Sequence, residues 1–206
     1  PVMSAVQAQA IWPAKPIRVI VPFPAGGTSD ILARLIGQKL TEAWGQQIIV
    51  DARPGATGTI GTDIVVRAPA DGYTLLLTDL GNLLIAPMTL PRVPFDSLRD
   101  LATVSMVSYS PHLLVVHPSV PAKNVAELIA LAKKSPGKLN APAALSSSPH
   151  LAGLMLQNRA GVKWTYIPTK GGAASMLALA TGEGDLMFLG ALQTLPHVRN
   201  GCAKLI

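Results

Sequence analysis

The sequence predicts an α/β fold in which helices cover both faces of a parallel sheet, and three observations lead to this prediction. The chain has 206 residues, of which 49% are hydrophobic and 14% charged, enough apolar material for a substantial core and too much for a disordered chain. Short continuous apolar runs alternate with segments in which the apolar residues have helical spacing. Turns rich in glycine or proline separate these segments, a rhythm typical of strands buried on both faces.

The first strand-loop-helix unit opens with the β-branched apolar run at residues 18–21, which predicts a buried strand. A glycine turn at residues 25–30 follows it. The apolar residues of 31–44 then have the spacing of an amphipathic helix, and Gly45 ends that helix.

The same unit recurs directly after this helix. Residues 47–50 predict a strand, and the glycine-rich loop 53–58 leads into a helix that ends near Arg67. After a turn at residues 69–72, the apolar run 73–77 predicts the next buried strand.

The middle of the chain has a weaker pattern. Residues 84–100 are rich in proline and are predicted to be irregular, and strand-like runs follow at 103–107 and 113–116. Asn124 and Glu127 then have the spacing of a capping box, which predicts the start of a helix.

The last third of the chain again alternates helices and strands. Ser148 and Pro149 are typical of an N-cap and a first helical position, and Gly161 ends the helix that they begin. The further predicted elements are a strand at 164–167, a helix at 172–180, a strand at 185–189, a helix at 192–199 and a strand that begins at 203.

Charge and composition restrict the classes of function. The formal net charge of +6 suggests an anionic partner. Because the cations are scattered singly and only 4% of residues are aromatic, a small anion is favoured over nucleic acid. The lone Cys202 excludes an internal disulfide and a multi-cysteine metal site. No run of 18 apolar residues lacks a charge or a strong breaker, which argues against a membrane-spanning helix.

Residues 1–10 predict the end of a secretory signal peptide. They are small and uncharged and finish with Ala8-Gln-Ala10, which fits the A-x-A pattern of a signal-peptidase site. An ordinary flexible leader would have a similar composition. We expect export, without a lipid anchor, because no cysteine follows the site.

The loop at residues 24–30 is the most informative candidate site. Glycines turn the backbone tightly and let a ligand approach it, and the first free N–H groups of the following helix attract an anion. Thr28 and Ser29 add hydroxyls, and the loop follows the carboxyl end of a strand, where ligands bind in open α/β sheets. The residues also allow a purely structural role, in which the glycines make the turn and Ser29 or Asp30 caps the helix.

A second candidate site combines Ser146, Ser147 and Ser148 with His150. Hydroxyls beside an imidazole suggest hydrolysis, but a serine run before a proline-started helix is more often a cap. The functional interpretation is a second anion-binding helix start that faces the first across a cleft. Lys170 precedes the next helix. It either supplies a third polar side of the cleft or lies in a solvated turn.

Motifs for cofactors and catalysis are missing from the sequence. It contains no P-loop, and the three-residue glycine period at 55–61 is not the dinucleotide fingerprint. There is no G-x-S-x-G elbow, and the four histidines show no metal-binding spacing. We therefore expect no cofactor, no metal and no enzymatic activity.

Seven motifs occur in a fixed order along the chain: P-I-R-V-I-V-P-F-P-A-G-G-T-S-D (16–30), R-P-G-A-T-G (53–58), A-D-G-Y-T-L-L-L (70–77), V-V-H-P-S-V-P (115–121), S-P-G-K-L (135–139), H-L-A-G (150–153) and G-D-L-M-F (184–188). Together they resemble the Bug/TctC family, the extracytoplasmic receptors of tripartite tricarboxylate transporters. The resemblance covers residues 12–206.

This resemblance implies a type II periplasmic-binding-protein fold, with two α/β lobes and a ligand cleft between them. Lobe 1 is expected at residues 11–112 and lobe 2 at 113–206. The first lobe is expected to be incomplete at its C-terminus, because a typical family member continues well past Ile206. An unpaired sheet edge would then favour self-association. Because the second of the two crossings between the lobes is cut at Ile206, hinge closure and ligand binding are expected to be weakened or lost.

The resemblance also implies a periplasmic receptor that captures a small carboxylate for the membrane subunits of a tripartite transporter. The expected ligand is a di- or tricarboxylate, an acidic amino acid or an aromatic acid. A receptor that docks on a membrane sensor kinase and an α/β enzyme acting on an anionic metabolite remain alternatives. The implied ligand-binding residues are Phe23, Pro24, Ala25, Gly26, Gly27, Thr28, Ser29, Asp30, Thr78, Asp79, Ser146, Ser147, Ser148, His150 and Lys170.

Two roles follow for the first loop. The ligand's carboxylate is expected against the backbone N–H groups of Gly26 to Ser29, and Asp30 is expected both to cap the helix and to face a donor on the ligand. In the second loop the family usually carries glycines where this chain has Leu145 and Ser147, which argues against a close backbone approach there.

Overall fold

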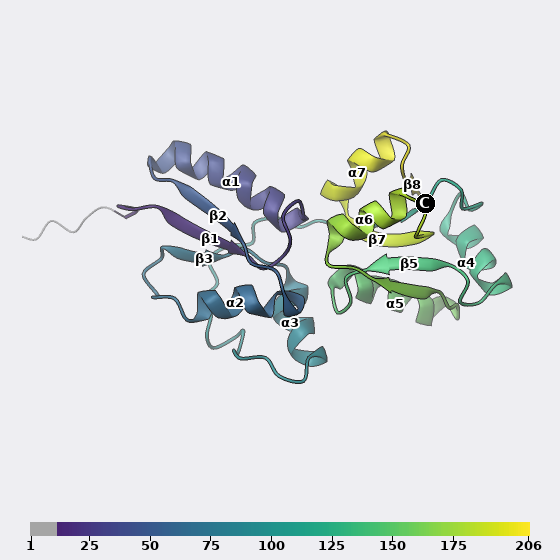
Figure 1. Ribbon diagram of the computed structural model, residues 1–206, viewed down its shortest axis with the longest axis horizontal. Coiled ribbons are helices and arrows are strands. Elements are labelled where there is room, and N and C mark those ends of the chain that lie inside the picture. The colour runs from purple at the N-terminus through teal and green to yellow at the C-terminus, as the bar shows by residue number, and fades with distance from the viewer. Residues whose placement is uncertain (1–11) are drawn as a thin grey trace, which may run out of the picture.

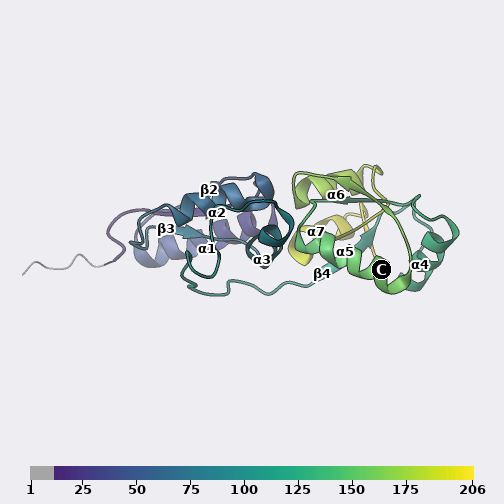
Figure 2. The ribbon, with the colours of Figure 1, turned by 90° about the horizontal axis from the view of Figure 1, so that it is seen from below.

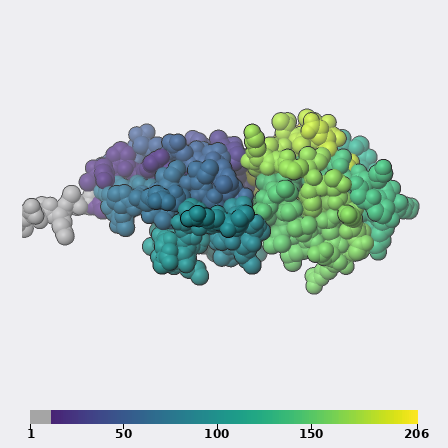
Figure 3. Space-filling view, turned by 60° about the horizontal axis from the view of Figure 1, so that its bottom comes forward, coloured from purple at the N-terminus to yellow at the C-terminus, as the bar shows by residue number. Residues whose placement is uncertain are grey.

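A computed structural model describes residues 12–206 as two α/β lobes that lie side by side (Figure 1). The space-filling view shows the two lobes in contact along one boundary (Figure 3). The predicted signal-peptide end at residues 1–10 lies outside the described residues. The division between residues 112 and 113 stays a prediction, and it falls inside the first strand of the second lobe.

A three-stranded parallel sheet forms the first lobe. Strand β1 (Ile17–Val21) lies between β2 (Ile48–Ala52) and β3 (Thr74–Leu76), and all of its residues except Arg18 are buried. Helices α1 (Thr28–Trp44) and α2 (Thr59–Val66) lie on opposite sides of this sheet (Figure 1). The prediction of a parallel sheet covered on both faces is confirmed for this lobe.

Helix α3 (Leu80–Thr89) extends into the segment 84–100 that the sequence predicts to be irregular, so that prediction is wrong for residues 84–89. Residues 90–100 form no helix or strand, as predicted. The side chain of Asp79 caps its first turn. Pro87 has no N–H to offer the carbonyl of Leu83, but the hydroxyl of Ser97 donates to that carbonyl at 2.9 Å. A helix thus tolerates the internal proline because a residue outside it supplies the missing donor.

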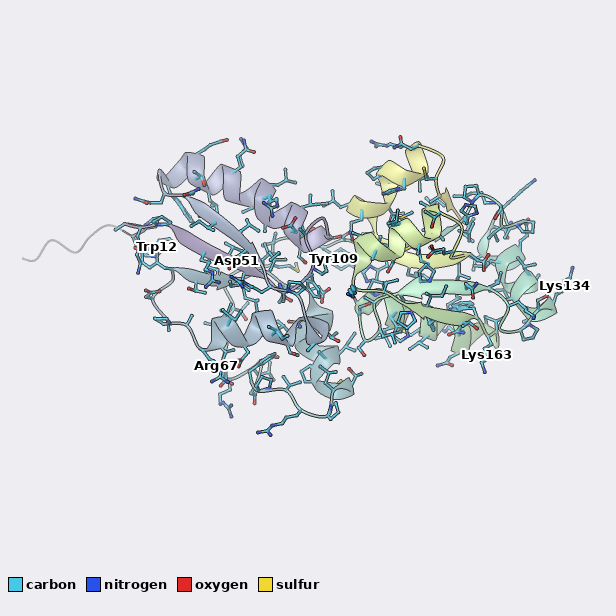
Figure 4. The ribbon with its side chains drawn as sticks, in the orientation of Figure 1. Trp12, Asp51, Arg67, Tyr109, Lys134 and Lys163 are labelled. Carbon is cyan, nitrogen blue, oxygen red and sulfur yellow. The ribbon has the colours of Figure 1, made fainter. Side chains whose placement is uncertain are left out.

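Residues 101–111 connect the lobes without forming a strand, so the strand predicted at 103–107 is wrong. Val104 and Met106 are 82% and 79% exposed. A strand needs a neighbour to complete its ladder, and no strand of residues 12–206 pairs with this segment. The segment runs past the first lobe toward the second (Figure 2), and Tyr109 lies near the place where the lobes meet (Figure 4).

The second lobe contains a three-stranded and a two-stranded sheet. Strand β4 (His112–Val116) pairs antiparallel with β7 (Leu186–Gly190) and with β8 (Lys204–Leu205), so a purely parallel sheet is the wrong prediction here. Only β5 (Asn140–Ala143) and β6 (Thr165–Pro168) pair in parallel. Continuous apolar runs report burial on both faces, and burial alone does not set the direction of a neighbouring strand.

The helices of the second lobe lie close to their predicted positions. They are α4 (Val125–Lys134), α5 (Ser148–Ala160), α6 (Gly172–Ala180) and α7 (Ala191–Arg199). The remaining helical element, in the first lobe, is the short 3₁₀ turn η1 (Ala56–Gly58).

The predicted helix starts are confirmed in one case and corrected in the other. Asn124 caps α4, its side chain accepting from the N–H of Glu127 at 2.9 Å. Helix α5 is capped by Ser147, whose hydroxyl accepts from the N–H of His150, so Ser148 is not the N-cap. Ser148 already belongs to the helix, and Pro149 lies in the first turn, where a missing N–H costs nothing.

No helix among residues 12–206 is long and apolar enough to cross a bilayer. Over the same residues, no group of histidine, cysteine and carboxylate side chains is arranged to hold a metal ion.

Candidate ligand-binding site

Several helices begin at the boundary between the lobes, which we call the inter-lobe junction. A Cβ added to Gly81, in the first turn of α3, would lie 3.1 Å from the backbone nitrogen of Ser148 at the start of α5. A Cβ on Gly171, the N-cap of α6, would lie 3.2 Å from Pro24 in the loop before α1. Because the N-terminal end of a helix carries partial positive charge, this arrangement favours an anion without requiring cationic side chains.

The loop before α1 already uses two of its backbone donors. Gly26 has a φ of +81°, which favours glycine, and its N–H donates to Oδ2 of Asp30 at 3.0 Å. The N–H of Gly27 points to the carbonyl of Pro24 at 3.4 Å. Both groups are therefore bonded within the chain, and the expectation that a carboxylate meets the N–H groups of Gly26 to Ser29 stays a prediction.

The next three backbone donors are free. Gly27 is the N-cap of α1, so the N–H groups of Thr28, Ser29 and Asp30 have no carbonyl of the helix to bond. Among residues 12–206 no other group accepts from them. They form a row of three donors at the positive end of a helix of 17 residues.

Asp30 supports this loop from inside the helix. It is 3% exposed, and Arg34 Nε lies 3.1 Å from each of its carboxylate oxygens. Neither Ser29 nor Asp30 is the N-cap, so the predicted cap is wrong; the Asp30 carboxylate bonds the N–H of Gly26, which precedes the helix. The hydrogen bond from Arg34 holds the pKa of Asp30 below its ordinary value of 3.8, although burial opposes this.

We expect Asp30→Ala to lower the free energy of unfolding by about 1–2 kcal/mol, since the N–H of Gly26 and the guanidinium of Arg34 lose their acceptor. Asp30→Asn retains an acceptor for Gly26 and should lose less. A carboxylate whose pKa is lowered by folding stabilises the protein above the unfolded value of 3.8, and this contribution disappears as the pH falls through the lower folded value. Urea unfolding of both proteins, at neutral pH and in steps below 3.8, measures the difference. Parallel pH profiles for the wild type and Asp30→Asn would contradict this assignment.

Gln193 of α7 forms hydrogen bonds with the same loop. The hydroxyl of Thr28 donates to Oε1 of Gln193 at 2.9 Å, and Nε2 of Gln193 donates to the carbonyl of Gly26 at 3.2 Å. The sequence analysis missed this residue because its partners lie 165 and 167 positions away and no local pattern marks it.

A cavity of about 250 Å³ opens beside this contact, between the start of α1 and helices α6 and α7. Its lining is mostly apolar: Gly26, Ile31, Ala173, Met176, Leu192, Gln193, Pro196 and His197. The predicted second loop at 146–150 does not line it.

The turn after β3 is held by Asn82, a buried residue that the sequence analysis did not single out. Asn82 is 1% exposed and accepts from the hydroxyls of Thr62, at 2.8 Å, and Thr78, at 3.1 Å. Its Nδ2 donates to the carbonyl of Thr57 at 2.7 Å, where the backbone has a φ of +55°. The hydroxyl of Thr78 is therefore directed toward Asn82.

Asp79, the other predicted residue of this turn, lies at the junction with its carboxylate capping α3 at 2.8 Å from the N–H of Asn82. Burial raises the pKa of Asp79, while the hydrogen bond from the Asn82 N–H and the charge of His112 oppose the rise. Gly81 lies close to this carboxylate as well as to Ser148. A Cβ added to it would be 3.1 Å from Oδ1 of Asp79. The turn after β3 and the start of α5 are thus brought together at the inter-lobe junction.

The loop before α5 is a cap rather than a catalytic pair. Ser146 has a φ of +60°, and its N–H points to Nδ1 of His150 at 3.3 Å. No serine hydroxyl of this run bonds the imidazole in the described structure, because Ser147 caps the helix instead. Burial lowers the pKa of His150, and the ring packs edge-on against Tyr166 with centroids 4.5 Å apart.

The remaining predicted residues are placed around the same boundary. Phe23 packs against the core of the first lobe, and Lys170 is exposed next to Gly171, which contacts Pro24. No hydrogen bond within residues 12–206 joins the loop 23–30 directly to the loop 146–150. Each of these two loops instead meets a different element of the opposite lobe.

Comparison with known proteins places the chain in a family. Residues 32–206 match the family model described as "Tripartite tricarboxylate transporter family receptor". The protein BugT of Bordetella pertussis is 39% identical over 92% of this chain and 59% of its own length. The curated relatives that match are longer, and the chain spans between 52% and 64% of their lengths.

Two solved structures carry bound carboxylates. "R. palustris Rpa4515 with adipate" is 33% identical with a TM-score of 0.90, and the match covers 95% of this chain and 66% of that one. MatC from Rhodopseudomonas palustris "with bound malate" is 29% identical with a TM-score of 0.86, over 94% and 66%. The expected two-lobed fold of periplasmic binding proteins is thereby confirmed. Because the family model matches most of this chain, from residue 32 to residue 206, the chain belongs to the receptor family of the tripartite tricarboxylate transporters.

Proposed function

We propose that this chain forms the solute-binding part of a periplasmic receptor that captures a small dicarboxylate between its lobes and presents it to the membrane subunits of a tripartite transporter. The observation that carries the proposal is the row of free N–H groups on Thr28, Ser29 and Asp30. They form the first turn of α1, at the inter-lobe junction. Relatives of the same fold have adipate and malate bound.

In this proposal one carboxylate of the ligand accepts hydrogen bonds from the first turn of α1. The other lies toward the second lobe, where α5 and α6 begin and Lys170 is the exposed cation. The lowered pKa of His150 leaves that ring uncharged at neutral pH, so backbone donors and helix dipoles supply most of the attraction. Asp30 acts through the loop that it holds, and Thr78 and Asp79 shape the facing wall.

Isothermal titration calorimetry with a panel of small acids tests the proposal. We expect saturable binding of a dicarboxylate such as adipate or malate, and no binding of 1,6-hexanediol, which has the length of adipate without its charge. Native mass spectrometry of the purified chain gives an independent reading of any retained acid. A folded sample that binds the neutral diol as well as the acids, or binds none of the acids at millimolar concentration, would refute the proposal.

A further inference from the structure

The hydrogen bonds that join the two lobes come from one side chain. Across residues 12–206, the only inter-lobe hydrogen bonds are the two made by Gln193, from Thr28 Oγ1 at 2.9 Å and to the Gly26 carbonyl at 3.2 Å. Within the same part of the chain no ion pair links the lobes. Gln193 is therefore the one side chain among residues 12–206 that takes part in both of these bonds.

Two glycines leave room for the Gln193 amide and its partner. A Cβ on Gly172 would lie 2.8 Å from Oε1 and 3.1 Å from Nε2 of Gln193, and 2.9 Å from Leu189. A Cβ on Gly190, the N-cap of α7, would lie 3.3 Å from the hydroxyl of Thr28. Two glycines of the second lobe thus leave the space in which the amide and the hydroxyl meet.

The orientation of the amide is set by both bonds together. Its oxygen accepts from a hydroxyl and its nitrogen donates to a carbonyl, and both partners belong to the short loop that ends at the free N–H groups of α1. Gln193 lies in the first turn of α7, directly after β7, so a rigid element carries it. Movement of the second lobe away from the first would break both bonds at once.

We propose that Gln193 is an inter-lobe latch, a positioning residue that holds the lobes together before any solute binds and fixes the loop that presents the donors of α1. The effect on ligand-free molecules does not depend on the proposed function, whereas the effect on affinity rests on it. Apparent affinity falls with the fraction of molecules in the binding-competent arrangement. Loss of two partly exposed neutral hydrogen bonds should therefore weaken dicarboxylate binding by roughly three- to thirtyfold.

The latch is tested first without ligand. Spin labels on the exposed native Cys202, in the second lobe, and on Ala43→Cys, at the exposed end of α1, report the distance between the lobes by double electron–electron resonance. Gln193→Met retains the length of the side chain and its packing but makes neither hydrogen bond. We expect this variant to shift the distance distribution to longer and broader values, and Thr28→Val to shift it less.

A matched control is Gln38→Ala, which removes an exposed glutamine that bonds only Glu42 on the same helix. It should leave the distribution unchanged. A distribution for Gln193→Met that overlays the wild type would overturn the latch, because packing alone would then suffice. If Gln193→Met changes the distance while the wild-type chain binds no dicarboxylate, the latch stands and the proposed function fails. If the wild-type chain binds dicarboxylates while Gln193→Met leaves the inter-lobe distance unchanged, the proposed function stands and the latch fails.

Discussion

Thr28→Pro is expected to lower the affinity for a dicarboxylate by roughly ten- to a hundredfold, because it removes one of the three free donors at the start of α1 and a hydrogen bond to a charged group contributes about 1.5–3 kcal/mol. The substitution suits the local backbone. Thr28 is the first residue of α1, where proline is favoured, and the preceding Gly27 has an extended ψ of 165°, as a residue before proline prefers.

The matched variant is Thr28→Val, which loses the hydroxyl and its bond to Gln193 but keeps the N–H. The ratio of the two affinities, measured by calorimetry, isolates the contribution of the backbone donor. Chemical denaturation should show nearly equal free energies of unfolding for both variants. Equal affinities in two well-folded variants would show that the carboxylate does not contact this N–H.

Asn82→Asp is expected to destabilise the chain by about 2–4 kcal/mol at neutral pH, the largest effect on stability that we predict. The buried amide donates to the carbonyl of Thr57, and a carboxylate in its place would face that carbonyl with a negative charge and no donor. Gly58 lies so close to the amide that a Cβ on it would overlap Nδ2, so the side chain has no room to turn away.

Asn158→Asp provides the control, because it makes the same chemical change at an exposed position on α5. It should alter the free energy of unfolding by less than about 0.5 kcal/mol. Urea unfolding at neutral pH measures both, and acidification should partly restore Asn82→Asp, since a protonated carboxyl can again donate to Thr57. A loss no larger than that of the control would mean that the turn after β3 is not held by this residue.

Much of the secondary structure could be predicted because its signals are local. Residues 18–21 and 73–77 are continuous apolar runs, and they form β1 and β3 of a parallel sheet. Gly45 and Gly161 end α1 and α5, as predicted, and the structure shows both in the left-handed conformation. Side-chain period and helix-end chemistry act within a few residues, so the sequence displays them directly.

The errors occurred where a distant partner decides the outcome. Helix α3 persists around Pro87 because Ser97 bonds the carbonyl that the proline leaves without a donor. The alternating segment at 103–107 forms no strand because no other strand lies beside it among the described residues. The direction of pairing in the second lobe likewise depended on how the chain returns, which a run of apolar residues does not encode.

By itself the sequence determined that a glycine loop joins the first strand to an amphipathic helix, and therefore that backbone donors gather at the carboxyl end of a sheet. Only the tertiary structure decided which donors remain free. The Asp30 carboxylate takes the N–H of Gly26, and Gln193 from the opposite lobe takes the Thr28 hydroxyl. Hydrogen bonds depend on distance and angle after the chain has folded, and a partner 165 positions away leaves no trace in the local pattern.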